Sequence, residues 1–143
     1  MTIERVEDKE SLRELLLLAD PDWNMVMKYL PQGEMYAAFE AGEPVCEAVV
    51  APREDGCLEL KNLATRPDRQ RRGLARALVD HLCQRYKGRY PALYVGTSGP
   101  ELYEHMGFAR DYVVKNFFLD NYPEPIYDEG VLCVDMYYLK RAL

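Results

Sequence analysis

One continuous stretch between Leu58 and Tyr86 constrains the fold most, because it reads as a strand, a basic turn and a long helix without interruption. Apolar and polar residues alternate over Leu58–Thr65, which is typical of a strand with one buried face. Apolar residues recur at helical spacing over Arg72–Tyr86 and give that segment one apolar face. A strand that feeds a helix in this way favours the α/β class of folds.

The alternation in this strand slips once, and the slip predicts a β-bulge. Leu58 and Leu60 share one face by simple alternation, whereas Leu63 falls on the other. One inserted residue near Asn62 would bring the three leucines to the same face. Bulges are common beside active sites.

The rest of the chain completes a single α/β domain over residues 1–143. We expect two-residue hairpin turns at Ala41-Gly42 and Asp55-Gly56. The expected strands are Thr2–Val6, Glu34–Glu40, Val45–Ala51, Pro91–Gly96, Ala109–Leu119 and Val131–Leu139. The expected helices are one capped by Asp8 and ending at Ala19, then Asp22–Leu30 and Gly99–His105, closed by Gly107. This order predicts a mixed sheet with helices on both faces.

Composition narrows the functional class. Of the residues 48% are hydrophobic, enough for a real core, yet no apolar run is long enough for a membrane span or a signal peptide. We therefore expect a soluble, cytoplasmic protein with no membrane partner. The four cysteines lack metal-ligand spacing, so we expect neither a metal site nor disulfides.

Charge is unevenly distributed along this acidic chain. The net charge is −6, but the segment Arg66–Arg76 holds five of the eighteen basic residues. A short basic segment in an acidic protein suits a compact anionic ligand better than a long nucleic acid. Gly73 stands where the helix begins, so a ligand can approach the backbone closely there, and the first helical turn offers unpaired N–H groups. The sequence therefore predicts a phosphate site at this helix N-terminus.

The residues of this turn match a known signature. Gln70-x-x-Gly73-x-Ala75 resembles the acetyl-CoA signature of the GNAT acetyltransferase superfamily, [Q/R]-x-x-G-x-[G/A], and Leu102–Phe108 is similar to the family's L-Y-x-x-x-G-F element. The resemblance covers essentially the whole chain. It implies a mostly antiparallel sheet flanked by helices, with a splay between strands four and five where acetyl-CoA binds. It also implies transfer of an acetyl group to a primary amine, by direct attack in a ternary complex and without a metal.

The resemblance assigns cofactor-binding residues one by one. Backbone groups of Leu63 and Thr65 would pair with the pantetheine arm as an added strand, with Ala64 packing between them. The turn and the first helical turn would cradle the pyrophosphate, through Gln70, Arg71, Arg72, Gly73, Leu74, Ala75 and Arg76. In relatives a longer Gly/Asn/Ser-rich segment follows strand five. Here Gly96–Pro100 is short and lacks the usual asparagine, which Ser98 would replace in part.

The resemblance also suggests catalytic residues. Tyr103, four residues before Gly107, lies at the family's general-acid position and would protonate the leaving thiolate. Glu59, eleven residues before Gln70, lies where some members place the general base; otherwise a water relay to backbone carbonyls would serve. Trp23 is a candidate wall of the acceptor pocket, and Asp128 or Glu129 would attract a cationic amine.

Three alternatives stay open at this stage. The acceptor is a small-molecule amine, a protein lysine or a protein N-terminus. A second alternative to an enzyme is a non-catalytic acyl-CoA-binding regulatory domain, although the intact Tyr103 favours the enzyme. The sequence leaves the oligomeric state undecided, with a homodimer as one alternative.

Overall fold

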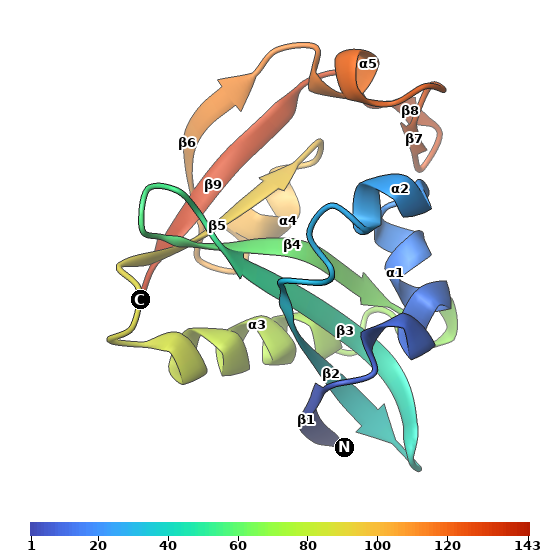
Figure 1. Ribbon diagram of the computed structural model, residues 1–143, viewed down its shortest axis with the longest axis vertical. Helices are drawn as coiled ribbons and strands as arrows, with labels where there is room; N and C mark the ends of the chain where they lie inside the picture. The colour runs from blue at the N-terminus through green and yellow to red at the C-terminus, as the bar shows by residue number, and fades with distance from the viewer. The chain divides into compact units, whose positions relative to one another are not determined.

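The computed structural model of the chain describes residues 1–143, which form two compact units, Met1–Leu93 with Leu143 and Tyr94–Ala142. Figure 1 labels their elements along the chain. The first unit contains β1 (Thr2–Val6), the 3-10 helix η1 (Lys9–Leu12), α1 (Arg13–Ala19), α2 (Trp23–Val26), β2 (Glu34–Glu40), β3 (Glu43–Pro52), β4 (Leu58–Thr65), the 3-10 helix η2 (Pro67–Arg69) and α3 (Leu74–Tyr86). None of the helices is long and apolar enough to cross a membrane.

In the first unit the strands follow the order β1-β2-β3-β4, and each neighbouring pair is antiparallel. Helices α1 and α3 cover opposite faces of this sheet, because alternate residues of β2 meet different helices. Met35 and Ala37 pack with α1 in one hydrophobic cluster, whereas the ring of Tyr36 contacts His81 and Tyr86 of α3. The predicted sheet with helices on both faces is confirmed in this unit.

The predicted bulge lies at Lys61. Val49 pairs with Asn62 and Val50 pairs with Leu60, so β4 holds one residue more than β3 at this point. The extra residue turns Leu60 toward α3 and Asn62 toward α1, and it places Leu63 on the same face as Leu60. The shift in alternation found in the sequence is thus a real bulge.

The face of the sheet beneath α1 carries a polar group that the sequence analysis did not single out. Glu47 of β3 is 0% exposed, and neither of its carboxylate oxygens has a hydrogen-bond partner. Burial raises the pKa of Glu47 to about 8; the nearby backbone amide of Ala64 acts in the opposite direction without reaching hydrogen-bond geometry. Asn62, on the same face, donates to the carbonyl of Leu16 at 3.1 Å and to Tyr29 Oη at 3.0 Å.

The second unit contains three strands in the order β5-β9-β6 and a small separate hairpin, β7-β8. Its elements are β5 (Ala92–Thr97), whose first two residues belong to the first unit, α4 (Glu101–Glu104), β6 (Ala109–Val114), α5 (Phe117–Asn121), β7 (Tyr127–Asp128), β8 (Val131–Leu132) and β9 (Met136–Ala142). Strands β6 and β9 pair antiparallel, so the α/β class with a mostly antiparallel sheet is confirmed. The splay expected between strands four and five falls where one unit passes into the other, and it stays a prediction, as does the single domain.

The prediction of two long strands near the C-terminus was wrong. Ala109–Leu119 divides into β6 and the helix α5, because Asn116 adopts a left-handed conformation (φ 57°) as the helix N-cap and accepts no further strand pairing. Val131–Leu139 divides into β8 and β9. Asp135 lies in the break between them, where its carboxylate accepts a hydrogen bond from the backbone N–H of Asn116 at 2.9 Å.

Smaller corrections concern turns and caps. Ala41-Gly42 is the predicted two-residue hairpin turn, with φ of 50° and 78°, but the loop around Asp55-Gly56 spans Arg53–Cys57. Its length follows from Arg53 N, which donates to Cys57 O at 2.7 Å, and from Asp55, which accepts from Cys57 N at 3.0 Å. Asp8 makes no side-chain cap, and a 3-10 turn precedes α1 instead. Helices Asp22–Leu30 and Gly99–His105 shorten to α2 and α4.

Glu47→Gln tests the buried carboxyl. The folded protein holds the Glu47 proton up to about pH 8, whereas the unfolded chain releases it near pH 4.5, so raising the pH between these values favours unfolding. We expect the free energy of unfolding of the wild type to fall over this interval, and the fall to be much smaller in Glu47→Gln. Urea unfolding at several pH values measures both. Parallel pH profiles of the two proteins would contradict the assignment.

Candidate cofactor site and acidic pocket

The turn between β4 and α3 has the backbone conformation of an anion site. Arg71 and Gly73 both lie in the left-handed region, with φ of 62° and 78°. Gly73 is the N-cap of α3, and no side chain caps the helix. The N–H groups of the first turn therefore face outward with the positive end of the helix dipole. This end of α3 is suited to bind a phosphate.

Gly73 leaves room for such a ligand. A Cβ built on Gly73 would meet no heavy atom within 4 Å, so the space beside the backbone is open. The positive φ of Gly73 also disfavours any residue with a side chain. A side chain at position 73 would therefore enter the space in front of the helix without disturbing the core.

The other cofactor-binding residues expected from the sequence surround this turn. The Gln70 side chain donates to the carbonyl of Thr65 at a long 3.4 Å and so links the two ends of the turn. Leu74 and Ala64 are buried, which leaves only their backbone groups for a ligand. Thr65 Oγ1 lies 3.2 Å from Cys46 Sγ. Pairing of Leu63 and Thr65 with a pantetheine arm stays a prediction.

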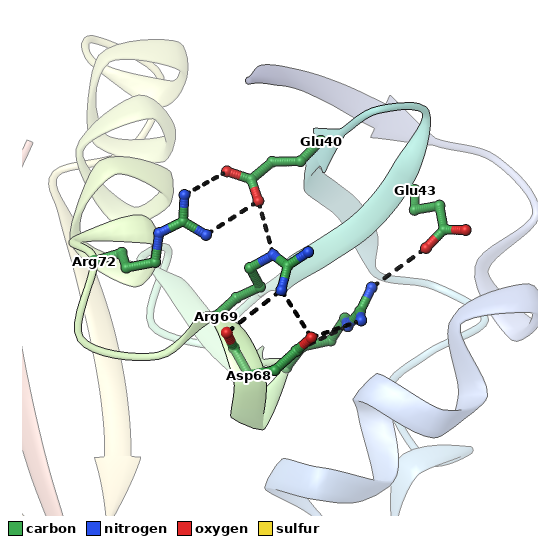
Figure 2. Close-up of polar contacts among 6 residues, drawn as sticks. Glu40, Glu43, Asp68, Arg69 and Arg72 are labelled. Carbon is green, nitrogen blue, oxygen red and sulfur yellow. Dashed lines mark hydrogen bonds and ion pairs between the residues drawn. The ribbon is translucent and has the colours of Figure 1, made fainter.

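Three arginines of this segment, Arg66, Arg69 and Arg72, are held by carboxylates (Figure 2). Arg72 and Arg69 both bind Glu40, the last residue of β2, at 3.1 to 3.3 Å. Arg66 pairs with Asp68 at 2.9 Å and with Glu43 at 3.4 Å. No local pattern in the sequence indicates Glu40, since folding alone brings the end of β2 to this turn.

Two arginines differ from that pattern. Arg76 lies 4.0 Å from Asp80 one helical turn further on, a weak and exposed ion pair. No side-chain hydrogen bond or ion pair joins Arg71, whose backbone forms the left-handed turn. Arg71 is therefore the basic side chain of the segment that is most available to an anion.

Tyr103 lies in the short helix α4 of the second unit, near its C-terminal end. Phe108 N donates to Tyr103 O at 3.1 Å and Gly107 N to Glu104 O at 3.1 Å, the two hydrogen bonds of a Schellman motif with Gly107 at φ 90°. The Tyr103 ring, 9% exposed, packs edge-on against Phe108 at 5.7 Å. Packing and helix termination thus explain Tyr103, Gly107 and Phe108 of this element, whereas Leu102 is exposed, and the acid role of the Tyr103 hydroxyl stays a prediction.

Glu59, the expected base, lies on the same face of β4 as Asn62, with two cationic neighbours. Its carboxylate forms ion pairs with Arg53 at 3.1 Å and with Lys61, the bulged residue, at 3.0 Å. Each carboxylate oxygen of Glu59 therefore has a cationic partner. Trp23 packs against the core beneath α1, with the Arg13 guanidinium 4.3 Å from its ring.

A pocket of about 440 Å³ lies within the second unit. Four carboxylates line it, and no Lys, Arg or His does. Glu101 and Asp135 already have cationic partners, Arg110 at 3.8 Å and Lys115 at 3.5 Å. The other two, from the β7-β8 hairpin, are the expected residues Asp128 and Glu129. The remaining wall is formed by Ser98, Gly99, Val131, Leu132, Cys133, Val134 and Tyr137, with Cys133 Sγ 3.4 Å from Ser98 Oγ.

Comparison with known proteins adds to this geometry. A family model described as "Acetyltransferase (GNAT) domain" matches residues 31–110. The Bacillus subtilis (strain 168) protein named "Uncharacterized N-acetyltransferase YvbK" is 32% identical over 136 residues, which cover 91% of this chain and 88% of the relative. A GNAT family acetyltransferase from Elizabethkingia anophelis, solved with acetyl-CoA bound, superposes with a TM-score of 0.91 at 34% identity, covering 99% of this chain and 97% of that one. The IAA acetyltransferase from Bacillus cereus ATCC 14579 gives a TM-score of 0.91 at 30% identity, with 99% of each chain covered.

Gly73→Glu tests the phosphate site. The new carboxylate would enter the open space at the positive end of α3, so we expect the Kd for acetyl-CoA to rise by about two orders of magnitude or more. Isothermal titration calorimetry measures this change. Gly88→Glu is a matched control, because Gly88 follows the other end of α3, has φ 80° and also has no atom within 4 Å of a built Cβ. Equal Kd values for acetyl-CoA in the two variants would contradict a phosphate site at the start of α3.

Proposed function

This chain belongs to the GNAT family of N-acetyltransferases, which take their acetyl group from acetyl-CoA, and on that premise we propose that its acceptor is the primary amine of a small cationic molecule. The amine attacks the thioester directly while both substrates are bound. Acetyl-CoA supplies an activated acetyl group. The chain's own residues bind the cofactor, attract the amine and manage two protons.

The acidic pocket is the observation that carries this choice of acceptor. Its volume of about 440 Å³ is within the usual range of small-molecule sites. Four carboxylates with no basic residue among them favour a positively charged group and disfavour anions. Because Glu101 and Asp135 are partly neutralised by their own partners, Asp128 and Glu129 supply most of the attraction.

At the cofactor site, the backbone of the Arg71–Arg76 segment binds the pyrophosphate. The open N-cap at Gly73 and the unpaired side chain of Arg71 support this assignment. Binding at a helix N-terminus adds the favourable field of the helix dipole to the hydrogen bonds of the first turn. Leu63 and Thr65 add backbone hydrogen bonds to the pantetheine arm.

Acetyl transfer also needs a proton acceptor and a proton donor, since the amine must be neutral to attack and the thiolate is a poor leaving group near neutral pH. We assign the donor to the Tyr103 hydroxyl. Glu59 is the proposed acceptor for the ammonium proton, and its ion pairs with Arg53 and Lys61 would have to loosen as the proton arrives. Both assignments come from positions in the family pattern.

Two further expectations remain predictions. A cytoplasmic location is in keeping with four cysteines that form no disulfide. A homodimer stays one alternative for the assembly.

Tyr103→Phe separates the acid role from the packing role. Phenylalanine keeps the ring against Phe108 and the Schellman motif, so the fold and the Kd for acetyl-CoA should stay close to the wild-type values. We expect kcat to fall by about 100-fold, the low end of general acid catalysis. The rate of thiol release at saturating concentrations of both substrates measures kcat. Tyr90→Phe, beyond the C-terminal end of α3, serves as the control, and a wild-type kcat in Tyr103→Phe would exclude the acid role.

Neutralising the acidic pocket tests the acceptor class. We expect Asp128→Asn with Glu129→Gln to raise KM for cationic amines by about 3- to 10-fold, as for the loss of exposed charge pairs, with kcat little changed. The effect should shrink as the salt concentration rises. Glu124→Gln, between α5 and β7 and outside the pocket, is the matched control. An unchanged KM for every cationic amine that is turned over would contradict the proposed acceptor.

A further inference from the structure

Glu40 makes a contact that neither the sequence nor the proposed function explains. Its two carboxylate oxygens accept hydrogen bonds from Arg72, Nη1 to Oε1 and Nη2 to Oε2, both at 3.3 Å. Oε1 also accepts from Arg69 Nε at 3.1 Å. Figure 2 shows the carboxylate between the two guanidinium groups, where the end of β2 meets the start of α3.

The arginine atoms that bind Glu40 are those that would bind a phosphate. A guanidinium group that uses two nitrogens on one carboxylate has the same paired geometry with a phosphate. Arg72 directly precedes Gly73, the open N-cap of α3. The carboxylate of Glu40 therefore occupies an anion-binding group one residue away from the candidate phosphate site.

The charges around this carboxylate cancel. Three arginines of the turn, Arg66, Arg69 and Arg72, form ion pairs with three carboxylates, Glu40, Glu43 and Asp68. The five basic residues counted in the sequence thus present far less net positive charge than their number indicates. A phosphate that uses the paired Nη1 and Nη2 atoms of Arg72, or Nε of Arg69, has to take the place of Glu40.

Such an exchange is inexpensive in this position. The side chains of Glu40, Arg69 and Arg72 are 24%, 34% and 53% exposed, so water can solvate whichever group is released. Exposed ion pairs contribute little to stability. Glu40 also stands beside the turn at Ala41-Gly42, where its side chain can turn into solvent without moving the sheet.

We propose that Glu40 is an internal competitor for the phosphates of acetyl-CoA: its carboxylate holds Arg69 and Arg72 in the free enzyme, and cofactor binding transfers them from Glu40 to a phosphate. This inference rests on the proposed cofactor site at α3. Its consequence is weaker binding of acetyl-CoA, and of CoA after the reaction, than the arginines alone would give. Glu40 acts through the two arginines and touches no reacting atom.

Glu40→Gln removes the competitor's charge and keeps its shape. We expect the Kd values for acetyl-CoA and CoA to fall by about 3- to 10-fold at low ionic strength, measured by calorimetry. Glu43→Gln is the matched control, since it removes the same charge from the same hairpin but from the partner of Arg66. A general electrostatic effect would change both variants equally, whereas the proposal expects less than about a 2-fold change in Glu43→Gln.

The Arg72→Gln background tests whether the effect passes through the arginine. Adding Glu40→Gln there should tighten binding much less than in the wild type, a non-additivity that a double-mutant cycle reports. Titration with 3′-dephospho-CoA identifies the phosphate: the Glu40→Gln effect disappears if the 3′-phosphate replaces Glu40 and persists if the pyrophosphate does. Either result supports the exchange.

Two results would overturn the proposal: a Glu40→Gln variant that binds acetyl-CoA no more tightly than Glu43→Gln, or an effect of the same size in the Arg72→Gln background. A different result would contradict the proposed cofactor site. If Gly73→Glu binds acetyl-CoA as the wild type does, the proposed site at α3 is wrong; if Gly73→Glu abolishes binding and Glu40→Gln changes nothing, only the role of Glu40 is wrong. Circular dichroism confirms that each variant is folded.

Discussion

Strand β4 has one residue more than β3 where the two strands pair. This extra residue decides which side chains of β4 face α1 and which face α3. Without the bulge at Lys61, Leu60 and Asn62 would share one face, so either a polar amide would lie under α3 or a leucine would be lost from that side of the core. With it, the leucines of β4 face α3, and Asn62 reaches Leu16 O and Tyr29. Strand β4 then enters the turn at Thr65 in a fixed orientation, which sets where α3 begins.

At the proposed phosphate site, backbone geometry and side-chain charge would contribute separately to the binding of an anion. Left-handed residues at positions 71 and 73 present the backbone N–H groups, and the missing Cβ of Gly73 provides the space. The arginines add less than their number indicates, because carboxylates neutralise three of them. Backbone donors cannot be neutralised in this way, so the site depends first on the conformation of the turn.

Basic and acidic side chains are concentrated in different parts of this chain. Basic side chains gather at the turn before α3, and four carboxylates, two of them ion-paired, line a pocket in the second unit. The anionic cofactor and the proposed cationic acceptor would thereby be attracted to different residues, and each would be disfavoured at the other's proposed site. A net charge of −6 hides this division, because the net charge adds both patches together.

The sequence by itself determined what is local or periodic. It predicted β2 and β4 to the residue, the bulge, the turn at Ala41-Gly42 and a glycine at the start of the long helix, because alternation and glycine conformations depend on near neighbours. The family pattern added the acetyltransferase identity. Residues 109–139 were predicted poorly, since Asn116 and Asp135, nineteen positions apart, meet only after folding and break both strands there. Tertiary structure alone decided which charges are neutralised: Glu40 meets Arg69 and Arg72 across about thirty residues of chain, and Glu47 is sealed beneath α1 without a partner. Such contacts depend on how the sheet and its helices pack, and no local pattern records them.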